Sequence, residues 1–374
     1  MQPTPSSSSV RSTIPAPFER GVRARIRAFS NKYAKVLWWA HSAYALTLGI
    51  SVVVFAQKGF EHARMLAVSI GAAWLLLLLL FRLFGTESTT QNASAAFVEQ
   101  GSKPRVDVRA LRFFAMTYLL KNLYQGMLFF LLPFYWKAST LDSINVIFVG
   151  VLGVFALLST LDVVFDRVLM KVRILGGLFH GFTLFACLNL VVPALISETP
   201  VLVSLLASVA IAVLSFFSLH LPLAALRNGK GAALLVLALG MSLGLAYAGR
   251  SAIPPVPMYL AHAAVGPQVM ANGRLAMEVK TLDASVVTRL VAVTDVALPS
   301  GKGDRLVHVW RRNGHAIQRS DESTSRVAGP DHSVRLRSTL DQSDLPKALA
   351  GNWSVDVETE DGQLVGRTKF AVTE

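Results

Sequence analysis

Long apolar stretches alternate with short polar links over the first two thirds of the chain, and this pattern predicts a membrane domain. A helix needs about 20 mostly apolar residues to cross a bilayer. We expect about seven spans, at residues 36–56, 65–84, 113–135, 143–165, 174–196, 201–221 and 232–248. The sixth span is the least clear, because His220 and Pro222 make its C-terminal boundary uncertain.

Beyond about residue 267 the pattern changes to apolar and polar residues in alternation, which is typical of β-strands. Alternating stretches lie at 274–282, 286–298, 305–320, 332–340 and 352–372. Asn313-Gly314 and Asp361-Gly362 divide two of them, and such pairs are strong hairpin signals because both residues tolerate positive φ. Short strands at this spacing predict an all-β antiparallel sandwich of the Ig-like kind.

These patterns divide the chain into four parts. Residues 1–35 are rich in Pro and Ser and then in Arg, so we expect a disordered, basic cytoplasmic segment. The helical transmembrane bundle follows at 36–249, and Pro254, Pro255 and Pro257 mark an extended linker at 250–266. The β-sandwich domain is expected at 267–374.

Charge sets the expected orientation of the chain. The net charge is +13, but from Arg250 onward 15 basic residues face 14 acidic ones, so the excess belongs to the membrane part. Basic residues collect in the N-terminal segment and in every second link between spans, and such links stay in the cytoplasm. We therefore expect the N-terminus inside and the β domain outside, and we do not expect nucleic acid as a partner.

Ionisable residues inside apolar spans suggest a second kind of site. Lys121, Asn122 and Gln125 lie in the third span, Asp162 in the fourth and His180 in the fifth. All fall in the same half of the predicted bilayer, and intramembrane charges are often functional. This group is a candidate polar site for a lipid headgroup or a proton relay. The alternative is structural, with Lys121 paired to Asp162 and His180 bonded to a neighbouring carbonyl.

The first predicted hairpin of the tail carries a candidate binding surface, formed by Trp310, Arg311, Arg312 and His315. An exposed Trp flanked by Arg could bind a sugar or an anionic polymer. The alternative places Trp310 in the core beside Trp353, because both lie on strands with apolar alternation. Cys187 is the sole cysteine, so neither an internal disulfide nor a Cys-pair zinc site can form. We expect no metal and no cofactor.

Two blocks of the sequence resemble a known kind of protein. They are the apolar region that closes on IPPVP, and the tail with VTDVALPSGKGDRLVHVWRRNGHAI and GNWSVDVETEDGQLVGRTKFAV. Together they resemble uncharacterised proteobacterial multi-pass inner-membrane proteins that end in a periplasmic β domain of unknown function. The resemblance implies a bacterial envelope and this architecture, and it implies no catalytic residue.

The sequence thus favours a non-enzymatic anchor in the inner membrane. Its β-sandwich would bind an envelope component, either a periplasmic protein or a glycan. The alternative is an intramembrane enzyme or transporter that acts on a lipid-linked substrate through Lys121, Asp162 and His180. No Walker loop, nucleophile elbow or HExxH helix is present to support an enzyme.

Overall fold

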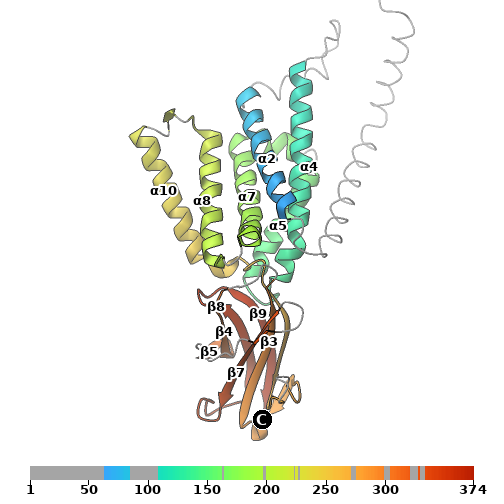
Figure 1. Cartoon of the computed structure of the whole chain (residues 1–374), viewed down its shortest axis with the longest axis vertical. Helices are drawn as coiled ribbons and strands as arrows, with labels where there is room; N and C mark the ends of the chain where they lie inside the picture. The colour runs from blue at the N-terminus through green and yellow to red at the C-terminus, as the bar shows by residue number, and fades with distance from the viewer. Residues whose placement is uncertain are drawn as a thin grey trace, which may run out of the picture.

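The computed structural model describes residues 63–84, 108–161, 164–196, 199–222, 224–225, 228–270, 275–298, 304–320, 327–328 and 333–374. Within these residues the chain forms a set of long helices followed by two β-sheets (Figure 1). The N-terminal segment 1–35 and the first expected span, 36–56, lie outside the described residues.

The described part of the helical region holds six α-helices, where the sequence predicted about seven spans. They are α2 Ala63–Phe84, α4 Val108–Lys137, α5 Asn145–Thr160, α7 Arg173–Leu195, α8 Val201–His220 and α10 Gly229–Ala248. Each helix overlaps an expected span, so the apolar pattern located them correctly. Three of them, α7, α8 and α10, are long and apolar enough to cross a membrane.

The fourth expected span, 143–165, was too long. Helix α5 has 16 residues, and the backbone of Leu161 is extended. A short π-helix, η2 Phe165–Leu169, follows the break. The hydroxyls of Ser159 and Thr160 donate back to carbonyls within α5, at 2.6 and 2.7 Å, and such bonds compete with the helical ladder.

A continuous apolar core joins α2, α4, α5 and α7. Residues of α4 at spacings of three and four, Leu120, Tyr124, Leu128, Leu131 and Tyr135, are completely buried in it. Helix α8 packs against α7, and α10 packs against α8. No described residue of α10 is buried, so much of its apolar surface is exposed.

The C-terminal region forms two sheets with a shared core. One has the order β1-β3-β7-β6 (Tyr259–Gly266, Arg289–Ala297, Ser333–Asp341, Val327–Ala328). The other has the order β2-β9-β8-β4-β5 (Thr281–Asp283, Leu364–Thr373, Gly351–Thr359, Leu306–Arg312, His315–Arg319). Val265 and Leu340 from the first sheet pack with Trp310, Trp353 and Phe370 from the second. This two-layer arrangement fits the expected sandwich, and the Ig-like assignment stays a prediction.

The two expected hairpins are present. Asn313 and Gly314 have φ values of 49° and 86° between β4 and β5, and Gly362 has a φ of 84° between β8 and β9. One pairing departs from the all-antiparallel prediction, because β2 runs parallel to β9.

The β domain begins earlier than expected. Strand β1 starts at Tyr259, inside the stretch predicted as a linker, and pairs with β3 along its whole length. The expected strand at 274–282 is largely absent, and only β2 and a bridge between Val269 and Leu275 form there. The physical boundary of the β domain therefore lies at Tyr259 rather than at residue 267.

The β domain sits against one end of the helical bundle (Figure 1). The link between α4 and α5, the start of α8 and the end of α10 all meet it there. We call this set of contacts the junction.

Candidate functional site

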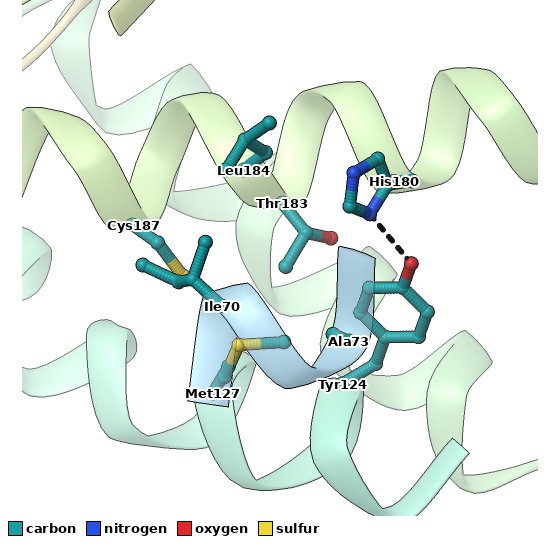
Figure 2. A pocket seen from close by; sticks show the side chains of 8 residues that line it. All are labelled: Ile70, Ala73, Tyr124, Met127, His180, Thr183, Leu184 and Cys187. Carbon is teal, nitrogen blue, oxygen red and sulfur yellow. Dashed lines mark hydrogen bonds between the residues drawn. The ribbon is translucent and has the colours of Figure 1, made fainter. Parts of the chain in front are cut away.

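A buried polar cluster in the bundle centres on His180, which α7 places against α4 and α8. Its Nδ1 lies 2.7 Å from the Tyr124 hydroxyl (Figure 2). Its Nε2 lies 3.1 Å from Ser215 Oγ. His180 is 1% exposed and Tyr124 is fully buried. A hydroxyl can donate or accept, so a neutral imidazole satisfies both contacts. We call these three residues the His180 cluster.

The cluster borders a void between α2, α4 and α7. It is lined by Ile70, Ala73, Tyr124, Met127, His180, Thr183, Leu184 and Cys187 (Figure 2). The lining is mostly apolar, and the void is too narrow to admit a water molecule. In this arrangement the void offers no room for a substrate, so the cluster acts as a packed polar contact between three helices.

The other expected members of the intramembrane site lie on α4. Lys121 is 3% exposed, its Nζ lies 5.7 Å from the centre of the Tyr118 ring, and it interacts electrostatically with Asp166. Gln125 is also buried, and Asn122 donates to the carbonyl of Tyr118 one turn earlier. Asp162 lies outside the described residues.

The partners of His180 were only partly visible in the sequence. Tyr124 lies in the polar stretch of the third span, three residues after Lys121, but nothing in that spacing assigns it to His180. Ser215 gave no signal, because serine is common in apolar helices, where it bonds within its own helix.

The expected binding surface in the tail is divided between core and surface. Trp310 is completely buried, and its Nε1 donates to Ser338 Oγ at 3.0 Å. Its ring meets Phe370 edge to face, and Phe370 in turn stacks with Trp353. The indole of Trp310 is therefore part of the core and not of an exposed surface.

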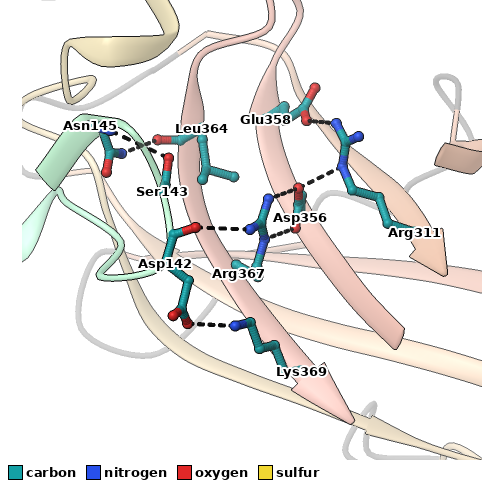
Figure 3. Close-up of polar contacts among 9 residues, drawn as sticks. All are labelled: Asp142, Ser143, Asn145, Arg311, Asp356, Glu358, Leu364, Arg367 and Lys369. Carbon is teal, nitrogen blue, oxygen red and sulfur yellow. Dashed lines mark hydrogen bonds and ion pairs between the residues drawn. The ribbon is translucent and has the colours of Figure 1, made fainter. Parts of the chain in front are cut away.

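The remaining residues of that surface have separate contacts. Arg311 forms ion pairs with Asp356 at 2.8 Å and with Glu358 at 2.9 Å (Figure 3). Arg312 donates twice to the carbonyl of Ala350. His315 is exposed at the hairpin. Both guanidinium groups therefore already have partners within the β domain, and these contacts stabilise the sheet.

The junction is the polar site that sequence reasoning missed. Asp304, just before β4, accepts the backbone N–H of Val201 at 2.9 Å and so caps the first turn of α8. Burial raises the pKa of the Asp304 carboxyl above its usual value. The Val201 side chain is itself buried among Leu306 and Val357 of the β domain. The start of α8 is therefore anchored both by a hydrogen bond and by apolar packing.

The link between α4 and α5 forms the second part of the junction. Asp142 pairs with Lys369 at 2.7 Å, and its carbonyl accepts from Arg367 at 3.3 Å (Figure 3). Asn145, completely buried at the start of α5, donates to the carbonyl of Leu364 at 3.4 Å. The hydrogen bond from Lys369 lowers the pKa of Asp142.

The end of α10 forms the third part. Arg250 Nε donates to the carbonyl of Asp361 at 2.6 Å, and the guanidinium also lies over the Tyr247 ring. In return, the Gln363 amide donates to the carbonyls of Arg250 and Ile253 at 3.4 and 3.5 Å. Asp361 and Gln363 flank the turn between β8 and β9, so this hairpin lies against the bundle.

Metal binding finds no support in the described part of the chain. No group of three or more His, Cys, Asp or Glu side chains there could hold a metal ion together. The junction is built from hydrogen bonds, packing and the Asp142–Lys369 ion pair, and the His180 cluster from hydrogen bonds and packing.

The chain matches two families whose function is unknown. Residues 21–291 match a family described as "Family of unknown function (DUF5924)", which is well over half of the sequence. The chain belongs to the DUF5924 family. Residues 303–372 also match a domain described as "Protein of unknown function (DUF2914)". No curated protein matches the chain.

The DUF5924 match extends beyond the helices into the β domain. It ends at Val291, the third residue of β3, and the DUF2914 match begins just before β4. Strand β3 pairs with β1 on one side and with β7 on the other, so the two matches contribute to one sheet. The expected resemblance to an uncharacterised family is confirmed to this extent. The bacterial source and the membrane topology stay predictions.

Proposed function

We propose that this DUF5924 protein is a multi-pass inner-membrane anchor that holds a periplasmic β domain in one orientation for binding. Its partner would be a protein or a glycan of the bacterial envelope, and no catalytic step is involved. The junction is the observation that carries the proposal. A tether alone would serve to retain a domain at a membrane, and linked domains move freely by default unless their interface is built to prevent it.

The distribution of basic links between the two ends of the helical bundle supports the same proposal. The helix ends at the junction belong to links that hold few basic residues and that we expected outside. Basic links such as 166–173 and 227–230 connect the opposite ends. The β domain thus meets the helix ends opposite the basic links, which supports a non-cytoplasmic position.

The proposal is tested by crosslinking in native membranes. Three proteins are compared: the full chain, a chain that stops after Met258 and so lacks the β domain, and a full chain that carries Asp304→Ala together with Lys369→Ala. We expect a protein or glycan that is recovered with the full chain, lost on truncation and reduced when the junction is weakened. Equal recovery with all three would contradict the proposal and place the binding site in the bundle.

The cap on α8 gives a local prediction. Asp304→Ala removes the acceptor of the Val201 N–H, and we expect a cost of about 1 kcal/mol. Hydrogen exchange at the first turn of α8 should accelerate, while exchange in the middle of α7 stays unchanged. Asp304→Asn is the control, because its amide oxygen can still accept, and an equal effect of both variants would argue against the cap.

The intramembrane reading stays a second candidate, because Lys121 and the His180 cluster are buried ionisable groups inside the bundle. An anchor should tolerate their loss. We expect Lys121→Met to leave partner recovery unchanged, as measured by the same crosslinking, and Lys230→Met serves as an exposed lysine control. Loss of a phenotype or of a bound lipid in Lys121→Met alone would favour the enzyme or transporter.

A further inference from the structure

His308 is a completely buried histidine at the centre of the β domain, and it bridges the two sheets. It lies on β4, and its Nε2 is 2.8 Å from Thr294 Oγ1 of β3. Its Nδ1 is 2.6 Å from Ser338 Oγ of β7. Ser338 Oγ also accepts from Trp310 Nε1, so the imidazole and the indole meet at one hydroxyl.

No carboxylate shares the inner face with this ring in the described strands. Strand register places the charged groups of β3, β5, β7 and β8 on outward positions: Arg289, Asp295, Arg319, Arg335, Arg337, Asp341, Asp356 and Glu358. Arg311 of β4 points outward as well, to Asp356. Arg312 has the inward register, but it lies at the far end of β4 and donates to Ala350.

The hydroxyl partners suit a neutral ring. One imidazole nitrogen donates and the other accepts, and Thr294 and Ser338 can take either role. A second proton would place a positive charge between the sheets, where the described strands offer no counter-ion and a charge is strongly disfavoured. Burial accordingly lowers the pKa of His308 to about 4.

The region around His308 is also the region that holds α8. His308 lies opposite Val357 in the sheet, and Val357 packs with Leu306 and with Val201 of α8. Asp304, which caps α8, precedes β4 directly. Loosening of β4 therefore removes both supports of the start of α8.

We propose that the β domain is an acid-responsive module, in which protonation of His308 opens the contact between the sheets and releases the start of α8 from the junction. The direction follows from linkage. An open form binds the proton near the ordinary His pKa of about 6.5, whereas the closed form resists it. The closed state is therefore fully favoured above about pH 6.5 and is weakened as pH falls toward about 4.

The test uses the full-length protein in lipid nanodiscs and hydrogen exchange at several pH values between about 6.5 and 4.5. One extra proton in the open form changes the opening equilibrium by about tenfold per pH unit. After correction for intrinsic exchange, we expect protection in β4, β7 and the first turn of α8 to fall toward that slope. The His308→Gln variant should lack this dependence, because its amide can donate and accept without titrating.

Two controls separate His308 from other groups. His315→Gln removes an exposed histidine on the neighbouring strand and should leave the slope unchanged. Asp304→Asn removes the carboxylate at the cap, whose pKa is raised by burial, and should leave the slope in β4 and β7 unchanged. A slope carried by Asp304 alone would overturn the assignment to His308.

Other results would also overturn the proposal. These are a pH slope that persists in His308→Gln, or opening of β4 with full protection kept at α8. If His308→Gln does not fold, hydrogen exchange of the wild-type protein still tests the proposal. Protection of β4 and β7 that is constant across this pH range excludes the switch. The inference concerns the β domain itself, so failure of the crosslinking test above would leave it standing.

Discussion

Trp353→Ala is expected to lower the free energy of unfolding of the β domain by about 3–5 kcal/mol, the range for a large aromatic removed from a core. Trp353 is 1% exposed, stacks with Phe370 at a centroid distance of 5.9 Å and donates to the Leu349 carbonyl at 2.8 Å. Alanine leaves a cavity between the sheets, and the rigid strands can close it only in part. Thermal unfolding of the full-length protein, followed by hydrogen exchange in β8 and β9, measures the loss.

The control for this prediction is Trp136→Ala. Trp136 lies near the end of α4 and is 56% exposed. Its loss should leave exchange in β8 and β9 unchanged. A similar destabilisation by both variants would mean that the core around Trp353 contributes far less than its burial indicates.

Asp356→Ala is the second substitution with a large expected effect. The Asp356 carboxylate is 1% exposed and accepts from Arg367 at 2.6 and 2.7 Å and from Arg311 at 2.8 Å (Figure 3). Removing it leaves two guanidinium groups side by side. A guanidinium group stays protonated in proteins, so neither arginine escapes the repulsion by losing its proton.

We expect Asp356→Ala to cost about 2–4 kcal/mol. This lies below the value for fully buried pairs, because the arginine side chains are 28% and 21% exposed and water screens part of the charge. The melting temperature of the β domain measures it. Asp142→Asn is the matched control, since the Asp142–Lys369 pair is more than half exposed and its loss should not change that temperature measurably. A stable Asp356→Ala protein would show that the arginines find other acceptors.

The family matches and the folded unit divide the chain differently. The DUF5924 match contributes β1 and the first three residues of β3 to the first sheet, and the DUF2914 match contributes β7. The central strand of that sheet is therefore supplied from outside the DUF2914 match. The two matches together cover most of the β domain, and neither one covers it alone.

Local patterns were sufficient for most of the secondary structure. The turn at Asn313-Gly314 forms because few other pairs adopt positive φ at two successive residues, so its position follows from two letters of sequence. Trp353 lies between the polar residues Asn352 and Ser354, which indicated its inward side. Helix ends were less predictable, as the early break after Thr160 shows, because a hydroxyl that bonds backward leaves no mark in hydropathy.

The candidate sites were harder to predict. The His180 cluster joins three helices through residues 35 and 56 positions apart, and the α8 cap joins Asp304 to Val201 across 103 positions. Neither pair has a sequence spacing that signals contact. Strand β1 was missed for a related reason. Three prolines precede it and its apolar and polar residues alternate only weakly, so its strand structure becomes evident only from its pairing with β3.

The sequence by itself determined the helical region, most of the strands, both hairpin turns and the place of the charge, because each depends on residues a few positions apart. The tertiary structure decided which polar groups meet. It placed Trp310 and His308 in the core, gave Arg311 to Asp356, and set the start of α8 on the β domain. Contacts of this kind depend on how whole helices and sheets are positioned, and that positioning comes from the summed packing of the fold rather than from any local run of residues.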